Sequence, residues 1–478
     1  MPQTWQAASK ERHFDASGYL SSRTIAALCT PTGGAICILR ISGNDAISIA
    51  EKLSAKSLKK ENHRRATRVW LRDSKSRRLD DGVLIPFFGP HSFTGEDTVE
   101  FFLHGSPMIA QRVLDECFEH GARLALPGEF SFRGVKNGKM TLSQAEAVKE
   151  LIQAENDFAL ELALEKLSGS QHELIERIRA DLMQLSTLSE VGIDFSDQDI
   201  DEVSLPRLRE RLQRVITLLS ELRGSFDRGK RFTDGVPVSI FGLPNAGKSS
   251  FFNALLGEDR SIVSNIAGTT RDVVREKLNL KADHGYVTLK LSDTAGLRKS
   301  SDVIEEIGIE RSLKAARESD LVVVVIDGVS PDLVEVKNYL SQVDLSQKSL
   351  SLVVSKKDLL ISQSQVLMSA QILEMFHVEP LFISSETHEG IQALAKQIAN
   401  QAESHLQRKP GEVVLTQFEH VHAVDESLKC LNRAMEAIDL VLFATDIRHG
   451  MNELGPLIGE TLPDDVLGKI FSDFCIGK

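Results

Sequence analysis

The chain has 478 residues, too many for a single hydrophobic core, so three or four domains are expected. Hydrophobic residues make up 42% and charged residues 26%, as in soluble globular proteins, and no run of 18 apolar residues predicts a membrane span. The net charge of −12 excludes a globally basic surface, so a nucleic acid would have to be met by a local basic patch or through a partner.

The N-terminal tail, residues 1–21, is polar and lacks the apolar core of a secretion signal. The five cysteines are an odd number without a C-x-x-C pair, which argues against a disulfide framework and against a zinc site. We therefore expect a cytoplasmic protein, with an organellar presequence as the alternative for the tail.

Residues 22–139 are predicted to form an α+β domain. Two strands joined by a glycine turn are expected within residues 24–40, and further strands at 68–71, 81–88 and 98–103. Two turn-rich segments, Phe93-Thr-Gly-Glu-Asp97 and Leu126-Pro-Gly-Glu-Phe130, carry carboxylates. Their chemistry alone favours ordinary solvated loops.

Residues 140–231 and 403–478 are predicted to be helical. Apolar residues recur at helical spacing, as in Ala147, Leu151, Ala154 and Phe158, and mostly indicate core packing. Residues 192–197 form an acidic break, after which Ser204 and Pro206 fit the start of a new helix. Because two helical blocks flank the segment 232–402, that segment is predicted to be a domain inserted into one helical domain.

Near its start, the inserted segment contains Gly242-Leu-Pro-Asn-Ala-Gly247-Lys248-Ser249, which fits the phosphate-binding loop G-x-x-x-x-G-K-[ST]. Glycines let backbone N–H groups surround the phosphates, Lys248 reaches the β- and γ-oxygens, and the hydroxyl of Ser249 suits Mg²⁺. The apolar run 236–241 before the loop predicts the strand that the motif requires.

Later motifs extend this pattern to a GTPase. Gly268-Thr-Thr-Arg-Asp272 and Asp293-Thr-Ala-Gly296 stand where switch segments meet Mg²⁺. The apolar runs 287–291, 321–326, 350–354 and 381–383 predict buried strands of a mostly parallel, Ras-like sheet. Ser355-Lys-Lys-Asp358 and Ser384-Ser-Glu386 follow two of these strands, where guanine-recognition motifs belong.

The predicted GTP-binding residues are Asn245, Ala246, Gly247, Lys248, Ser249, Ser250, Ser264, Asn265, Ile266, Ala267, Gly268, Thr269, Thr270, Asp293, Thr294, Ala295, Gly296, Ser355, Lys356, Lys357, Asp358, Ser384, Ser385 and Glu386. Ser355 stands where Asn-Lys-x-Asp motifs have asparagine. The loss of one neutral hydrogen bond there is expected to cost ~1 kcal/mol, or about fivefold in affinity.

The motifs together resemble the tRNA modification GTPase family called MnmE or TrmE, over residues 22–478. They are Ile36-Cys-Ile-Leu-Arg-Ile-Ser-Gly43, Phe93-Thr-Gly-Glu-Asp97, Pro127-Gly-Glu-Phe130, Asn137-Gly-Lys139, Gln144-Ala-Glu-Ala147, the GTPase motifs and the terminal Cys475-Ile-Gly-Lys478. The resemblance implies a GTP hydrolase that acts in the modification of C5 of the wobble uridine in certain tRNAs.

The resemblance further implies a homodimer whose N-terminal domain binds 5-formyl- or methylene-tetrahydrofolate. It implies a flavin- and NADH-dependent partner protein, with which the dimer forms a heterotetramer that adds a carboxymethylaminomethyl group. By motif, Arg40, Glu100, Lys139 and Lys478 would contact the folate, and Cys475 could contribute a thiolate or simply pack.

For catalysis, Leu297 occupies the position of the water-orienting glutamine of many small GTPases, so another group must act. The resemblance implies that Glu305 orients water and that K⁺ assists at the phosphates, with Asn245 and Lys248 in catalytic roles. The implied K⁺ ligands are Asn245, Ser264, Ile266 and Thr269, and the implied Mg²⁺ ligands are Ser249 and Thr270.

Two other classes of protein remain as alternatives. A ribosome-assembly or RNA-checkpoint GTPase should carry a basic RNA-binding appendage after the GTPase domain, whereas this chain continues into an acidic helical segment. A nucleotide-dependent scaffold would fit a decayed site, but Lys248, Ser249, Thr270 and Asp293 are all present.

Overall fold

The computed structural model describes residues 17–194, 204–258, 276–292, 305–409 and 411–459, together with 468, 470–472, 474 and 476–477. The chain forms two compact units. One contains Met1–Lys149, Leu167–Asp199 and Ala437–Lys478, and the other contains Glu150–Lys166 and Ile200–Glu436. Each unit combines helices with one sheet, which confirms the predicted multidomain α/β class. The domain boundaries given above stay predictions.

The first unit is built around a six-stranded sheet in the order β3-β4-β5-β2-β1-β6. The strands are β1 (Ile25–Leu28), β2 (Ile36–Ser42), β3 (Thr67–Arg72), β4 (Arg78–Phe87), β5 (Thr98–His104) and β6 (Arg123–Leu124). All pairs are antiparallel except β1 with β6. The strands expected at the sequence level are thus present.

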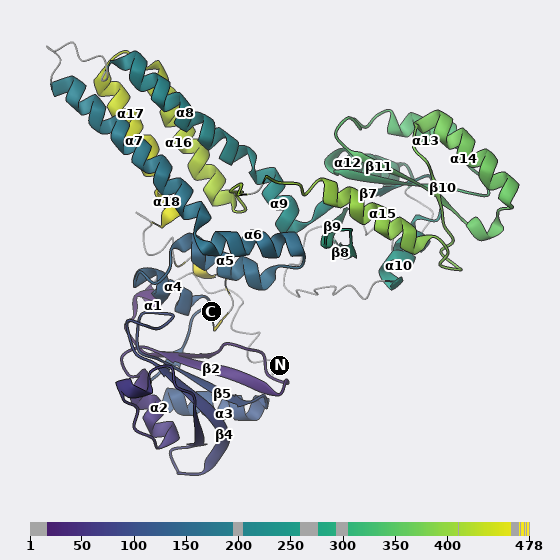
Figure 1. Ribbon diagram of the computed structural model, residues 1–478. Helices are drawn as coiled ribbons and strands as arrows, with labels where there is room; N and C mark the ends of the chain where they lie inside the picture. The colour runs from purple at the N-terminus through teal and green to yellow at the C-terminus, as the bar shows by residue number, and fades with distance from the viewer. Residues whose placement is uncertain are drawn as a thin grey trace. The chain divides into compact units, whose positions relative to one another are not determined.

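One face of this sheet is covered by α2 (Ala46–Ser54) and α3 (Pro107–Glu119), which lie against it in Figure 1. Alternate residues such as Leu39, Ile41, Phe101 and Leu103 point into this core. The residues between them, including Arg40 and Glu100, therefore belong to the opposite face.

A smaller core in the same unit joins the two ends of the chain. Tyr19, of α1 (Ser17–Leu20), and Phe132, of α4 (Glu129–Lys136), pack with Leu142, Ala145, Phe471 and Phe474. The rings of Phe132 and Phe471 are 5.8 Å apart and nearly perpendicular. The C-terminal segment is thus part of the core of the N-terminal domain.

The first unit also contains a long antiparallel pair of helices. The longest, α7 (Ser170–Asp194), packs along α17 (Leu440–Glu453), and α18 (Gly455–Ile458) follows. The division between the units falls within α5 (Leu142–Gln153) and α6 (Asp157–Ser168).

The second unit contains the other helical pair, in which α8 (Leu205–Gly224) packs with α16 (Phe418–Glu436). Helix α9 (Phe226–Asp234) follows α8 in the chain. Ser204 occupies the N-cap position of α8 and Pro206 lies in its first turn, as predicted. The chain then enters the nucleotide domain.

The sheet of the nucleotide domain has the order β12-β11-β10-β7-β9-β8. Its strands are β7 (Val236–Phe241), β8 (Glu276–Lys281), β9 (Tyr286–Ser292), β10 (Leu321–Asp327), β11 (Ser349–Ser355) and β12 (Leu381–Phe382). All pairs are parallel except β8 with β9. Strand β8 of this sheet and strand β6 of the first sheet were not predicted from the sequence.

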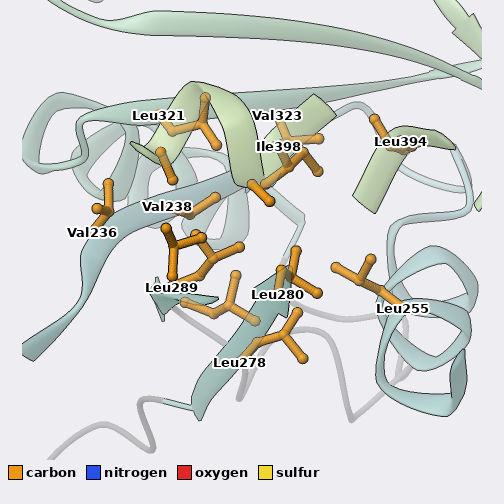
Figure 2. Packing of buried hydrophobic residues seen from close by; sticks show 14 of the residues in the cluster. Val236, Val238, Leu255, Leu278, Leu280, Leu289, Leu321, Val323, Leu394 and Ile398 are labelled. Carbon is orange, nitrogen blue, oxygen red and sulfur yellow. The ribbon is translucent and has the colours of Figure 1, made fainter. Parts of the chain in front are cut away.

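Helices cover both faces of this sheet (Figure 1). They are α10 (Lys248–Glu258), α12 (Glu305–Glu318), α13 (Leu333–Leu340), α14 (Ser362–Phe376) and α15 (Ile391–Ser404), with a short 3-10 helix, η4, at Lys357–Leu359. Figure 2 shows strand residues such as Val238, Leu289 and Leu321 meeting Leu394 and Ile398 of α15. Burial on both faces explains why these strands read as continuous apolar runs.

In the described ranges, we find no helix with both the length and the apolar character required to cross a membrane.

Candidate functional site

The phosphate loop lies between the end of β7 and the start of α10. A Cβ on Gly242 would sit 2.4 Å from the carbonyl oxygen of Val325 in β10, so only glycine allows this approach. Asn245 and Gly247 have φ angles of 59° and 88°, in the left-handed region that turns the chain back toward the helix. The loop therefore brings backbone N–H groups and a helix N-terminus together, as an anion-binding site requires.

Lys248 is hydrogen-bonded to the backbone of this loop. Its Nζ donates hydrogen bonds to the carbonyl oxygens of Gly242 (2.7 Å) and Leu243 (2.8 Å). Burial lowers the pKa of Lys248 from its ordinary value, because the charged form loses hydration. A phosphate nearby would favour the charged form, so binding of GTP and protonation of Lys248 support each other.

Ser355 connects the base-recognition strand to the phosphate loop. Its buried hydroxyl, at the end of β11, lies 2.8 Å from the carbonyl oxygen of Ala246 and 3.2 Å from that of Ile326. A hydroxyl has one proton, so it donates to one of these acceptors at a time, and Ala246 is the nearer. The serine thus keeps part of the bracing role that we expected to be lost with the asparagine.

Lys356 and Asp327 form a second connection at the same edge of the sheet. Lys356 has a left-handed φ of 57°, and its Nζ lies 2.6 Å from a carboxylate oxygen of Asp327 at the end of β10. Burial opposes ionisation there, but hydrogen bonds from Lys356 and from the amides of Val329 and Ser330 hold the pKa of Asp327 below its ordinary value. The side chain of Lys356 is therefore held against Asp327, at the carboxyl end of β10.

The two predicted base-recognition loops lie side by side. The amide of Lys357 donates to the carbonyl oxygen of Ile383 (2.9 Å), and the buried Ser384 hydroxyl accepts from the amide of Thr387 (3.1 Å). Asp358 and Glu386 are exposed, and Ser385 is half-buried. Asp358 is thus accessible to a base placed over these loops.

Many of the predicted nucleotide- and cation-binding residues lie outside the described residues. This applies to Ser264, Asn265, Ile266, Ala267, Gly268, Thr269, Thr270, Asp293, Thr294, Ala295 and Gly296. Glu305 begins α12, but its side chain is not described. Asn245, Ser249 and Ser250 are exposed on the loop and on the first turn of α10.

In the first unit, two predicted folate residues form an ion pair. Arg40 and Glu100 are direct partners across β2 and β5, with Arg40 Nε and Nη2 at 2.9 and 2.8 Å from Glu100 Oε1. The guanidinium also lies over the rings of Phe93 (5.0 Å) and Phe130 (5.4 Å). The two charged groups are 16% and 17% exposed, so the pair is largely but not completely enclosed.

Lys139 lies close to the loop that contains Phe93. A Cβ on Gly95, whose φ is 79°, would be 3.2 Å from the Cε of Lys139, and Asn137 Nδ2 donates to the carbonyl oxygen of Thr94 (2.7 Å). The fold thus joins the segments Phe93–Asp97 and Asn137–Lys139, which are separate in sequence.

The C-terminal tail reaches β1. A Cβ on Gly477 would lie 2.1 Å from the carbonyl oxygen of Leu28, next to the residue that pairs with Arg40. Glycine at 477 is therefore required by this close contact. Lys478 and Cys475 lie outside the described residues.

The solvated-loop interpretation of the two acidic turns is wrong. Glu129 is fully buried, and its carboxylate accepts hydrogen bonds from both Arg123 (2.6 and 2.8 Å) and Arg133 (2.8 Å). Arg133 also donates to Glu96 of the other turn (2.9 Å). A buried charge requires such partners, and the two arginines come from segments that sequence chemistry alone did not connect to these turns.

These features define a P-loop GTP-binding protein that carries an additional sheet domain and two helical segments. Comparison with known proteins extends this assignment. Residues 24–139 match the family model "GTP-binding protein TrmE N-terminus", and residues 142–475 match "MnmE helical domain".

Among curated relatives, the tRNA modification GTPase MnmE of Aquifex aeolicus (strain VF5) is 37% identical, over 95% of this chain and 99% of the relative. The protein of the same name from Azoarcus sp. (strain BH72) is 38% identical, over 95% and 98%. The chain belongs to the MnmE/TrmE family of tRNA modification GTPases and is a GTP hydrolase of tRNA modification. This membership favours tRNA modification over the ribosome-assembly and scaffold alternatives.

Ser355→Ala tests the connection between β11 and the phosphate loop. Removing the hydroxyl leaves the carbonyl oxygen of Ala246 without this donor, so we expect GDP and GTP affinity to fall about fivefold, the equivalent of ~1 kcal/mol. Fluorescent-nucleotide titration measures this. Ser351→Ala is the matched control, because Ser351 is buried on the same strand but bonds to Gln401. This role would be contradicted if the Ser355 variant bound nucleotide as tightly as the unsubstituted protein. It would also be contradicted if the Ser351 variant lost as much affinity as the Ser355 variant.

Proposed function

We propose that this GTPase, with a flavin- and NADH-dependent partner protein, adds a carboxymethylaminomethyl group to C5 of the wobble uridine of certain tRNAs. The main support is that relatives named tRNA modification GTPase match nearly the whole chain. The two family models also match, over residues 24–139 and 142–475. The proposal includes a homodimer in the cytoplasm that assembles with the partner into a heterotetramer.

The nucleotide half of the reaction is hydrolysis of GTP to GDP and phosphate. Lys248 would leave the loop carbonyls to contact the β- and γ-phosphates, and Asp358 would accept hydrogen bonds from the guanine N1–H and 2-amino groups. Adenine lacks this donor pattern, so guanine remains preferred despite Ser355. Glu305 is assigned to orient the attacking water.

Two cations belong to this proposal. Ser249, on the first turn of α10, has an exposed hydroxyl that suits Mg²⁺ together with Thr270. Asn245 presents an exposed amide at the turn of the phosphate loop, which suits K⁺ together with Ser264, Ile266 and Thr269. A monovalent cation bound there would supply positive charge against the phosphates, the role that an arginine has in other GTPases.

A tetrahydrofolate would be held on the face of the first sheet opposite α2 and α3, at the partly exposed pair Arg40–Glu100. Glu100 Oε1 is engaged by Arg40, and Oε2 has no hydrogen bond among the described residues, so it can accept from the N–H edge of a pterin. The remaining N–H groups of Arg40 and the Lys139 ammonium suit the glutamate carboxylates. Phe93, which is half-buried beside Arg40, provides aromatic surface for a heterocycle.

The wobble modification itself can be tested in cells. Deletion of this protein should leave C5 of the wobble uridine unmodified in its substrate tRNAs, and re-expression should restore the modification. Mass spectrometry of tRNA nucleosides measures both. An unchanged nucleoside profile in the deletion strain would refute the proposed function.

Hydrolysis of GTP should depend on the monovalent cation. Because Leu297 cannot hydrogen-bond to water, the rate in potassium should exceed that in sodium by at least about tenfold, and Asn245→Ala should remove the difference. Phosphate-release assays at equal ionic strength measure this. Equal rates of the unsubstituted protein in the two salts would exclude the cation role.

Folate binding should depend on Arg40. Arg40→Ala should weaken binding of 5-formyltetrahydrofolate by roughly 1.5–3 kcal/mol, because a hydrogen bond to a charged group is lost. Isothermal titration calorimetry on the full chain measures this. Arg68→Ala is a matched control, since Arg68 is on the same sheet and pairs with Asp81 but is 77% exposed. Absence of binding to the unsubstituted chain would remove the folate claim.

A further inference from the structure

One segment of the first unit has a charge opposite to that of the whole chain. Residues 52–78 contain eleven lysines and arginines and two acidic residues, which leaves +9 in a chain whose net charge is −12. The segment runs from the end of α2 through the 3-10 helix η2 (Lys60–Asn62) and β3 to the start of β4. It is therefore a local basic patch of the kind that an acidic protein needs to meet a nucleic acid.

The fold places this segment at an edge of the sheet. Strand β3 is the terminal strand, and Val69 and Leu71 are buried, whereas Arg68 and Trp70 are exposed. Arg64 extends the ladder through its amide to the carbonyl oxygen of Pro86 (2.8 Å). Arg64, Arg65, Arg68 and Arg72 thus lie along this edge, and Lys59 and Lys60 precede them in the chain.

Most of the positive charge on this edge is not neutralised. Lys59, Lys60 and Arg65 are exposed and form no ion pair with a described carboxylate. Arg68 pairs with Asp81 and Arg77 with Asp73, but these arginines are 77% and 74% exposed, where ion pairs contribute little. Exposed cations without partners concentrate the local field for an anionic partner.

The exposed side chain of Trp70 lies among these basic residues. Trp70 is 43% exposed, an unusual position for a tryptophan, and the guanidinium carbon of Arg78 lies 4.5 Å from its ring centroid. An exposed ring beside arginines is the arrangement on which proteins stack unpaired bases. It does not help recognition of an acidic protein surface, for which the lysines and arginines alone would suffice.

We propose that the edge formed by residues 52–78 binds tRNA directly, with Lys59, Lys60 and Arg65 contacting phosphates and Trp70 stacking on an unpaired base. This inference rests on the role of the family in tRNA modification. It adds a tRNA-binding surface to the N-terminal domain, outside the nucleotide and folate sites.

The phosphate contacts are tested by the salt dependence of tRNA binding. The triple variant Lys59→Gln/Lys60→Gln/Arg65→Gln of the full chain should bind unmodified tRNA transcript at least about tenfold more weakly at ~100 mM salt, with a log–log salt slope smaller by roughly two to three. Fluorescence anisotropy measures both quantities. The matched control is Lys281→Gln/Lys314→Gln/Lys337→Gln, which changes the charge equally at exposed sites elsewhere and should bind as the unsubstituted protein does.

The stacking contact is tested by the fluorescence of Trp70 itself. The chain has two tryptophans, so in a Trp5→Phe background Trp70 is the single reporter. Saturating tRNA should quench it, and Trp70→Leu should weaken tRNA binding at unchanged oligomeric state. Quenching that a polyphosphate reproduces would show that the ring senses charge only and would overturn the stacking role.

The outcomes separate this surface from the proposed function. Equal tRNA affinity of the triple variant and the control would overturn the proposal. A triple variant that retained tRNA binding but lost flavoprotein binding would also overturn it, because the edge would then be a protein-docking surface. GTP hydrolysis without tRNA should be unchanged in all these variants. If the deletion strain kept its wobble modification while the triple variant lost tRNA affinity, the proposed function would fail and the tRNA-binding surface would stand.

Discussion

Parallel pairing of β7, β10 and β11 is the constraint on which the nucleotide site depends. Since parallel strands end at the same edge of a sheet, the phosphate loop after β7, Asp327 after β10 and Ser355 at the end of β11 meet there. The approach is close enough that Gly242 has no room for a side chain against Val325. Lys248 and Ser355 then donate to loop carbonyls, which holds the loop in place.

The nucleotide domain could be predicted from sequence because its chemistry is local. Strand β7 has the predicted bounds, and β10 and β11 extend the predicted runs by one or two residues, because strands buried on both faces must be continuously apolar. Strand β8, Glu276–Lys281, was missed because it is an edge strand in which polar and charged residues alternate with buried Leu278 and Leu280. Such a strand lacks the continuous apolar run from which the other strands of this sheet were predicted.

The N-terminal site could be predicted only in part, since its contacts join distant segments. Motif resemblance pointed to Arg40 and Glu100, but only the antiparallel register of β2 and β5 shows that they neutralise each other. Glu129 illustrates the same limit, because its burial is tolerated only through Arg123 and Arg133. The basic run of residues 52–78 is visible in the sequence, yet the exposure of Trp70 beside Arg78 follows from the position of β3 at the sheet edge.

The small core around Phe132 connects the N-terminal domain to the C-terminal segment. Phe471 and Phe474 pack with Phe132 and Tyr19, and Gly477 fits against Leu28, so these C-terminal residues complete the core of the N-terminal domain. A fragment ending near residue 139 would expose the ring of Phe132 and lose the tail that approaches β1. Burial of a phenylalanine side chain is worth roughly 1.5–3 kcal/mol, a large share of the stability of a small domain. The N-terminal domain therefore depends on the C-terminal segment for part of its stability.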